Sequence, residues 1–332
     1  MTYRIITHGG CSSMDGFSSA FIFKKYFCPL FDITDVEIIG LNPYDIQNGE
    51  FEFTDKDIVL DLPLPQQKIF FWCDHHLSAK PKDTLPENHY FKEVPSCAGL
   101  LIDILKEKGV KITEALQEFK KVIDIMDGAE YSKDDIKLVY YQQASYDNPT
   151  TLEKLHMISA MMHTRDQFVN WEFFRTLLEE ELGETPIDSE TWWDLRPRIF
   201  YKALLASYAE WREWVDEFIV FNDESKCVVQ DNRVAESRQK GNTDRFYQYI
   251  KFDDASYGIN MKVVDKDVAR IGIGSNIFHK DRCKINIGRV CKEVADKFGD
   301  GAGGGHYYVG GCTINAEKCD DALAFILERM EN

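Results

Sequence analysis

The chain has 332 residues, about twice the usual length of a single domain, which predicts two domains. Hydrophobic residues make up 44% of it and charged residues 29%, which argues against a disordered or fibrous chain. The formal net charge of −17 at pH 7 disfavours long nucleic acids and anionic membranes as partners, because both require a basic surface. A small anionic substrate in a locally positive pocket is compatible with this charge.

The sequence lacks an apolar run of the roughly 18 residues that a membrane span requires, and its start, MTYRIITHGG, does not read as a signal peptide. Its nine cysteines are odd in number and include no CxxC pair. Such usage suits reduced thiols inside a cell better than a disulfide framework or a zinc ribbon. We therefore expect a cytoplasmic protein.

The first 110 residues alternate between strand and helix patterns. Runs rich in β-forming residues occupy 3–7, 36–41, 58–62 and 68–73. A helical pattern over 15–27 follows the first run, and a second one with Ser96 as its N-cap and Gly109 as its stop follows the last. This alternation predicts a parallel α/β sheet.

The rest of the chain divides into a helical stretch and a second α/β segment. Residues 151–218 show no strand pattern and are expected to form helices that cover the sheet and then connect the domains. Strands are predicted at 246–252, 258–264, 269–274 and 307–314, helices at 287–298 and 316–331, and a glycine-rich loop at 299–305. We expect a first domain over 1–190, a helical linker over 191–217 and a second, smaller domain over 218–332.

Histidine and aspartate residues stand at the end of three of the predicted strands or directly after them. They are His8, Asp61, Asp74, His75 and His76. Ligands of open α/β sheets gather outside the carboxyl ends of the strands, so these side chains are expected to converge. Together with Asp15 and Asp127 the set has four carboxylates and three imidazoles, and a carboxylate majority favours Mn²⁺ or Mg²⁺ over zinc.

Two further aspartates extend this set. Asp15 stands at the amino end of the first helix, and Asp127 lies in the segment Asp-Ile-Met-Asp-Gly-Ala-Glu, where Asp124 is the alternative. Each residue alone has a structural explanation, for example Asp15 as a helix N-cap. A packing role explains Asp-His-His after an apolar strand less well, so the whole set favours a metal site.

Four motifs carry a family resemblance. They are Thr7-His8 followed by Asp15-Gly16, Val59-Leu60-Asp61-Leu62-Pro63, Phe71-Trp72-Cys73-Asp74-His75-His76, and Gly303-Gly304-Gly305-His306. In this order they resemble the DHH/DHHA1 phosphoesterases, in particular the nano-RNase and exopolyphosphatase-like subfamily. The resemblance covers most of the chain. It implies an N-terminal DHH domain and a C-terminal DHHA1 domain joined by helices, with the active site in the cleft between them.

The resemblance also implies the metal ligands. Asp61 would bridge two divalent ions, with Mn²⁺ expected and Mg²⁺ the alternative. Asp15, His75 and Asp127 would complete one site and His8 would contribute to the other. The family usually has a further aspartate between the first histidine and Asp15, which this sequence lacks. Water, Cys11 or a serine hydroxyl would then complete the site beside His8, or the ion there would bind only with substrate.

The remaining candidates concern catalysis and substrate binding. Asp74 and His76 are predicted to orient a ligand or to contact a phosphoryl oxygen, and Asp74 is equally compatible with a structural role. The resemblance implies a substrate clamp formed by Gly303, Gly304, Gly305 and His306. Asn276 is a further candidate, or alternatively a turn residue. A substrate-holding arginine is expected to be Arg282 or Arg270.

These observations predict a metal-dependent phosphohydrolase in which metal-activated water attacks phosphorus. Its expected substrates are short oligonucleotides, linear or cyclic dinucleotides, or nucleotide phosphomonoesters. An exopolyphosphatase-like enzyme and a non-catalytic nucleotide-binding regulator are the alternatives. Long nucleic acid and membrane are not expected as partners. The oligomeric state stays open, and a homodimer is compatible with the sequence.

Overall fold

The structure is a computed structural model. It describes residues 2–9, 13–41, 45–46, 49, 51–76, 79–141, 149–163, 179, 196–233, 243–305 and 307–331. The chain forms two compact units, one of residues 1–130 and 144–202 and the other of residues 131–143 and 203–332. The division into domains at 190 and 218 stays a proposal.

The first unit is built on a parallel sheet. Its strands are β1 (Tyr3–His8), β2 (Val36–Leu41), β3 (Asp57–Leu60), β4 (Phe71–Asp74) and β5 (His89–Phe91). The strand order is β2-β1-β3-β4-β5, and every neighbouring pair is parallel. Strands β1, β3 and β4 therefore end side by side at one edge of the sheet.

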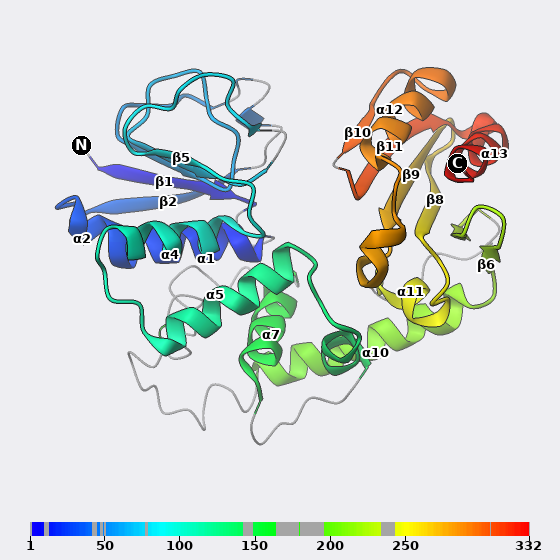
Figure 1. Cartoon of the computed structure of the whole chain (residues 1–332), viewed down its shortest axis with the longest axis horizontal. Coiled ribbons are helices and arrows are strands. Elements are labelled where there is room, and N and C mark those ends of the chain that lie inside the picture. The colour runs from blue at the N-terminus through cyan, green and yellow to red at the C-terminus, as the bar shows by residue number, and fades with distance from the viewer. Residues whose placement is uncertain are drawn as a thin grey trace. The chain divides into compact units, whose positions relative to one another are not determined.

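Helices cover one face of this sheet. Figure 1 shows α1 (Met14–Ile22) and α4 (Cys97–Glu107) lying together along it. Each helix has a serine as its N-cap. The Ser13 hydroxyl accepts a hydrogen bond from the Gly16 amide, and the Ser96 hydroxyl accepts one from the Gly99 amide. The other face packs against loop residues, in a cluster of Ile6, Phe53, Val59, Leu62, Ile69 and Trp72.

Further helical segments precede and follow α4 along the chain. The first unit continues with α5 (Glu114–Asp127) and α7 (Thr151–His163), and α1 leads into the π-helical turn η1 (Phe23–Phe27) and the short α2 (Cys28–Leu30). The second unit contains α6 (Lys133–Ile136) and η3 (Lys137–Tyr141). The long helix α10 (Arg196–Val215) belongs to both units.

The second unit contains a mixed sheet. Its strands are β6 (Ile219–Asn222), β7 (Cys227–Asp231), β8 (Tyr257–Asp265), β9 (Val268–Ser275), β10 (Gly303–Gly305) and β11 (Val309–Asn315). They are ordered β10-β11-β9-β8-β7-β6, and every pair is antiparallel except β7 with β8. Its helical elements are α11 (Tyr247–Lys251), η4 (Ile277–Arg282), α12 (Ile287–Phe298), η5 (Ala316–Lys318) and α13 (Cys319–Met330).

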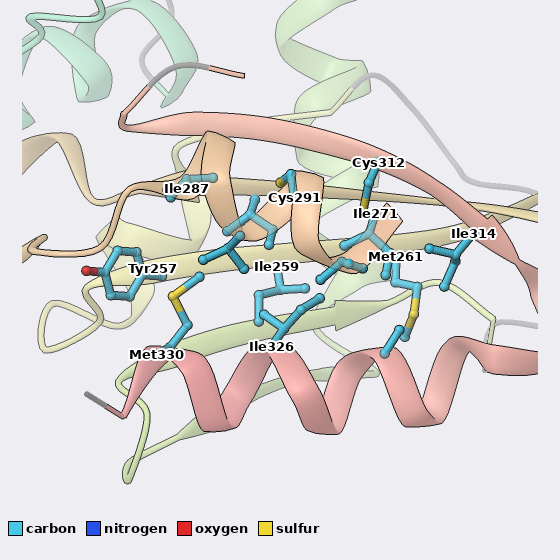
Figure 2. Packing of buried hydrophobic residues seen from close by; sticks show 14 of the residues in the cluster. Tyr257, Ile259, Met261, Ile271, Ile287, Cys291, Cys312, Ile314, Ile326 and Met330 are labelled. Atoms are coloured by element: carbon cyan, nitrogen blue, oxygen red, sulfur yellow. The ribbon is translucent and has the colours of Figure 1, made fainter. Parts of the chain in front are cut away.

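One hydrophobic core holds this unit together. Figure 2 shows Ile259 and Met261 of β8 packed with Ile326 and Met330 of α13, and α12 adds Ile287 to the same cluster. All five side chains are at least nine-tenths buried. Burying such side chains is the main stabilising contribution to a unit of this size.

The structure corrects two predicted elements. The last three residues of the predicted glycine-rich loop at 299–305 form the strand β10 and pair with β11. The predicted strand over 246–252 is instead the short helix α11 (Tyr247–Lys251), because the Asp244 carboxylate holds its start: the amides of Phe246 and Tyr247 each donate a 3.2 Å hydrogen bond to it. The predicted fold class, a parallel-sheet α/β unit followed by a second α/β unit, is confirmed. Among the described helices, none has the length and apolar character needed to cross a bilayer.

Candidate metal centre

The carboxyl ends of three neighbouring strands bring the first unit's histidines and aspartates together. His8 ends β1, Asp61 follows β3, and Asp74 ends β4. Because β3 lies between the other two strands, Asp61 lies in the middle of the cluster. It contacts both sides, with 3.4 Å from its Oδ2 to His8 Nδ1 and 3.4 Å from its Oδ1 to His75 Nε2.

The Nε2 atom of His75 faces three carboxylates. Its Nδ1 lies 2.9 Å from the backbone oxygen of Val94, so the neutral ring carries its proton on Nδ1. Its Nε2 lies 3.4 Å from oxygens of Asp61 and Asp127 and 3.5 Å from one of Asp15. This nitrogen is buried and has no hydrogen-bond partner among the described residues.

The cluster fits a divalent cation. Oδ1 of Asp61 is also buried without a hydrogen-bond partner in the described part of the chain, and leaving two such polar atoms unpaired is costly unless an ion completes them. Two sets of potential ligand atoms each lie within 4.8 Å of one another: Asp15, His75 and Asp127, and Asp61, Asp74, His75 and His76. Carboxylates with imidazole match the preferences of Mn²⁺ or Mg²⁺.

Asp15 is fixed by the amino end of α4. Its two carboxylate oxygens accept backbone hydrogen bonds, 2.7 Å from the Cys97 amide and 2.9 Å from the Ala98 amide. Asp15 is 2% exposed, so a helix N-terminus replaces water around its charge. The carboxylate is thereby held in the orientation in which Oδ2 faces His75.

Asp61 is held by its backbone. Its φ of +56° lies in the left-handed region, which residues other than glycine adopt rarely and mostly at constrained sites. Its amide donates a 3.0 Å hydrogen bond to the Cys73 carbonyl oxygen, which ties the end of β3 to β4. The hydroxyl of Ser13 donates to Asp61 Oδ2 at 3.3 Å.

Mutual attraction and repulsion shift the pKa values of this cluster. Burial lowers the pKa of His75, but the nearby Asp61 together with the charges of Asp15 and Asp127 outweighs it and raises the pKa to about 10. Burial and the neighbouring carboxylates raise the pKa of Asp15 well above its usual range. Burial also raises the pKa of Asp61. The surrounding histidines outweigh this effect and hold the pKa of Asp61 below its usual value. The site is therefore rich in charge that a cation would neutralise.

Asp74 organises the two histidines that follow it. One oxygen, Oδ1, accepts hydrogen bonds from the amides of His75 at 2.7 Å and His76 at 3.1 Å, and lies 2.8 Å from His76 Nδ1. Its other oxygen, Oδ2, is buried without a hydrogen-bond partner among the residues that the structure describes. His76 is one-third exposed, so its ring is accessible from the site. The catalytic roles of both residues stay proposals.

The region around His8 is described only in part. A Cβ atom at Gly16 would lie 2.5 Å from the His8 carbonyl oxygen, so glycine is required for α1 to begin this close to β1. Cys11, the candidate ligand beside His8, lies outside the described residues.

The structure separates the two aspartates of α5. Asp127 faces His75, whereas Asp124 accepts a 2.5 Å hydrogen bond from the Ser96 hydroxyl and pairs with Lys120 Nζ at 2.8 Å. Asp124 thus links α5 to the N-cap of α4, the helix that holds Asp15. The sequence pattern identifies Ser96 as an N-cap but not this link, because the bond joins residues 28 positions apart.

In the second unit, close packing explains why glycine occupies two positions of the run Gly303–Gly305. A Cβ at Gly303 would lie 2.6 Å from the Cys291 carbonyl oxygen, and one at Gly305 would lie 2.4 Å from Gly310 Cα. A Cβ added at Gly304 would instead have no heavy atom of the described residues within 4 Å. These glycines let β10 pack closely against α12 and β11, and their role as a clamp stays a proposal. His306 lies outside the described residues.

The other substrate-binding candidates differ in exposure. Asn276 is fully buried: its side-chain Nδ2 donates a 2.8 Å hydrogen bond to the Ala255 carbonyl oxygen, and its Oδ1 accepts one from the Phe278 amide at 3.0 Å. Arg282 is exposed, and its Nη1 donates 3.2 Å to the backbone oxygen of Asp253. Arg270 is exposed on β9. Substrate contact by any of them stays a proposal.

Comparisons with known proteins are informative for structure. No protein-family model matches the chain, and no curated protein matches it in sequence. A pGpG-specific phosphodiesterase, PggH from Vibrio cholerae, is similar over 99% of each chain with a TM-score of 0.69 and 19% identity. An exopolyphosphatase-related protein from Bacteroides fragilis matches over 99% of this chain and 92% of its own, with a TM-score of 0.54 and 12% identity.

Exonuclease RecJ bound to manganese is similar as well, over 98% of this chain and 90% of its own, with a TM-score of 0.55 and 13% identity. Each of these matches extends across both units of the chain. The resemblance stated from the sequence motifs is therefore confirmed at the level of structure, and the chain has the fold of the DHH/DHHA1 phosphoesterases.

Proposed function

We propose that this chain is a divalent-metal-dependent phosphoesterase that hydrolyses short phosphodiesters to mononucleotides. The observation that carries this proposal is the buried Nε2 of His75, which faces oxygens of Asp15, Asp61 and Asp127 without a hydrogen-bond partner among the described residues. Two divalent ions bound there would supply an activated water and neutralise phosphoryl oxygens during in-line attack.

The chain's own residues would divide the remaining tasks. Asp61 lies between the His8 and His75 sides, as a bridging ligand requires. The backbone oxygen of Val94 keeps the His75 ring oriented. The contact of Asp74 with His76 Nδ1 orients the imidazole ring of His76, which would contact a phosphoryl oxygen.

Short substrates fit the charge of the chain. With 39 basic and 56 acidic residues, its surface repels polyanions that extend beyond the site. The similarity to a pGpG-specific phosphodiesterase supports a linear dinucleotide as the first substrate to test. Short oligonucleotides, cyclic dinucleotides and nucleotide phosphomonoesters follow, and inorganic polyphosphate is the second enzymatic candidate.

A non-catalytic nucleotide-binding regulator is the rival function. It is supported by the sequence between His8 and Asp15, which lacks the further aspartate that family members usually carry. Such a regulator would bind nucleotides without turnover.

The experiment is a hydrolysis assay with Mn²⁺, Mg²⁺ or EDTA on a linear dinucleotide, a cyclic dinucleotide, 3′-phosphoadenosine 5′-phosphate and polyphosphate. We expect mononucleotide release with Mn²⁺, none with EDTA, and none from the His75→Ala variant. The matched control is His89→Ala, a histidine of the same sheet outside the cluster. Undiminished turnover by His75→Ala would contradict hydrolysis at the proposed metal centre. Nucleotide binding without turnover by the unmodified chain would favour the regulator.

A further inference from the structure

The tip of the β10–β11 hairpin presents two aromatic side chains to solvent. Tyr307 is 39% exposed and Tyr308 44% exposed. Their rings form an edge-to-face pair with centroids 4.9 Å apart and an interplanar angle of 71°. Neighbouring exposed aromatic residues form an apolar surface of a kind that commonly marks a binding site.

The pair is held in place by the surrounding sheet. The Tyr307 hydroxyl donates a 2.7 Å hydrogen bond to the Lys284 carbonyl oxygen, and the Ile287 amide donates 2.9 Å to the Tyr307 carbonyl oxygen. The Ser275 amide donates 2.8 Å to the Tyr308 carbonyl oxygen. Because the backbone and one ring are already fixed, a ligand that stacks on them loses little conformational entropy on binding.

A lysine ammonium group lies beside one of these rings in a strongly acidic chain. Lys280 Nζ lies 5.9 Å from the centroid of the Tyr308 ring, and Arg282 and Lys284 follow in the sequence. Asp281 is the one acidic residue between Lys280 and Lys284. Within the described part of the chain, no carboxylate forms an ion pair with any of the three basic side chains.

We propose that Tyr307 and Tyr308 form a stacking site for a nucleobase and that Lys280 and Lys284 attract the phosphate of the same nucleotide. Aromatic faces beside cations match the two parts of a nucleotide, a planar base and an anion. The inference rests on the proposed function, because the nucleotide would be part of the phosphodiester substrate. It assigns nucleotides, rather than inorganic polyphosphate, as the substrate class.

The test compares a 5′-phosphorylated linear dinucleotide with its abasic analogue, using the full-length chain. Affinity is measured by calorimetry in EDTA, and KM is measured with Mn²⁺. Losing a stacked base typically weakens binding by about 5- to 100-fold, so Tyr308→Ala should raise Kd and KM for the dinucleotide by that factor and leave those for the abasic analogue unchanged. Tyr308→Phe, which keeps the ring, should stay within about twofold of the unmodified chain.

Controls separate stacking from loss of fold. Val220→Ala removes an exposed apolar side chain from β6, at the opposite edge of the same sheet, and should change neither constant. If Tyr308→Ala fails to fold, Tyr308→Leu keeps the bulk without the ring and should show the same loss.

Three results would overturn the inference: equal losses for the dinucleotide and its abasic analogue, an equal loss in Tyr308→Phe, or a Tyr308→Ala variant that changes oligomeric state but not nucleotide affinity. Failure of the proposed function is distinguishable from all three. In that case the dinucleotide binds in a Tyr308-dependent manner but is not hydrolysed.

Discussion

The Asp15 carboxylate accepts a 2.7 Å hydrogen bond from the backbone amide of Cys97, 82 residues further along the chain. This contact joins the start of α1 to the start of α4 directly beside His75. Anything that moves the amino end of α4 therefore moves a candidate metal ligand. Asp124, which holds the N-cap Ser96, is the residue best placed to show this dependence.

Replacing Asp124 by alanine should weaken metal binding although Asp124 faces away from the metal cluster. The substitution removes the acceptor of the Ser96 hydroxyl and the partner of Lys120, which should cost about 1–3 kcal/mol in the free energy of unfolding. As a positioning residue, it should also raise the Mn²⁺ concentration for half-maximal activity several-fold more than it lowers kcat at saturating Mn²⁺. Thermal unfolding and Mn²⁺ titration measure both effects.

The control for this variant is Asp103→Ala. Asp103 also lies near Lys120, at 3.6 Å, but its side chain is 39% exposed and, unlike that of Asp124, does not hold the Ser96 hydroxyl. An exposed pair of this kind contributes less than about 1 kcal/mol, so the Mn²⁺ dependence should not change. If Asp103→Ala and Asp124→Ala shift the Mn²⁺ requirement equally, the positioning role of Asp124 is wrong.

Gly99→Ala should destabilise the first unit. A Cβ atom there would lie 2.3 Å from Asp124 Oδ1 and 2.7 Å from the Ser96 hydroxyl oxygen, inside the link between α4 and α5. Overpacking typically costs about 1–3 kcal/mol, which denaturant unfolding can measure. Gly272→Ala is the control, since no heavy atom of the described residues lies within 4 Å of its added Cβ. Equal stability of the Gly99→Ala variant and the unmodified chain would contradict this packing.

Metal affinity should rise with pH. In the metal-free protein the pKa of His75 is raised to about 10 from its ordinary value of 6.5. A proton on His75 therefore stabilises the metal-free fold fully below pH 6.5, and this contribution is lost as pH rises toward 10. Because a metal ligand must give up that proton, Mn²⁺ affinity should increase by up to about tenfold per pH unit in this window.

Calorimetry in buffers of different ionisation heat measures this coupling as proton release on Mn²⁺ binding. We expect release of about one proton at about pH 7.5, since one ligand histidine is protonated there. Binding that is independent of pH between about 6.5 and 8.5 would contradict the displacement of a proton from His75 by the metal.

His8→Ala should reduce the number of bound ions rather than abolish binding. His8 contacts Asp61 on the side away from His75, and it is one-third exposed. Equilibrium dialysis with Mn²⁺ should therefore show loss of the weaker ion and retention of the one held by Asp15, Asp61, His75 and Asp127. Complete loss of Mn²⁺ from His8→Ala would contradict two separable sites.

The core of the site is predictable from the sequence because strand ends are recognisable. His8, Asp61 and Asp74 follow apolar β-forming runs, and neighbouring parallel strands end at the same edge of a sheet. The backbone conformation of Asp61 is not predictable in this way, since its left-handed φ depends on the hydrogen bond to Cys73 of the next strand.

Tertiary contacts explain the other differences. The aromatic alternation over 246–252 is typical of a strand, but the buried carboxylate of Asp244 holds the start of a helix there. The choice between Asp124 and Asp127 depends on which face of α5 turns toward His75 and which toward Ser96. Sequence spacing alone places both at the end of the same helix.

The most direct test of the metal centre is anomalous scattering at the manganese absorption edge from crystals of the full-length chain grown with Mn²⁺. We predict an anomalous peak in contact with the carboxylates of Asp15, Asp61 and Asp127 and with His75 Nε2. A well-ordered crystal with saturating Mn²⁺ and no peak among these four side chains would contradict the account.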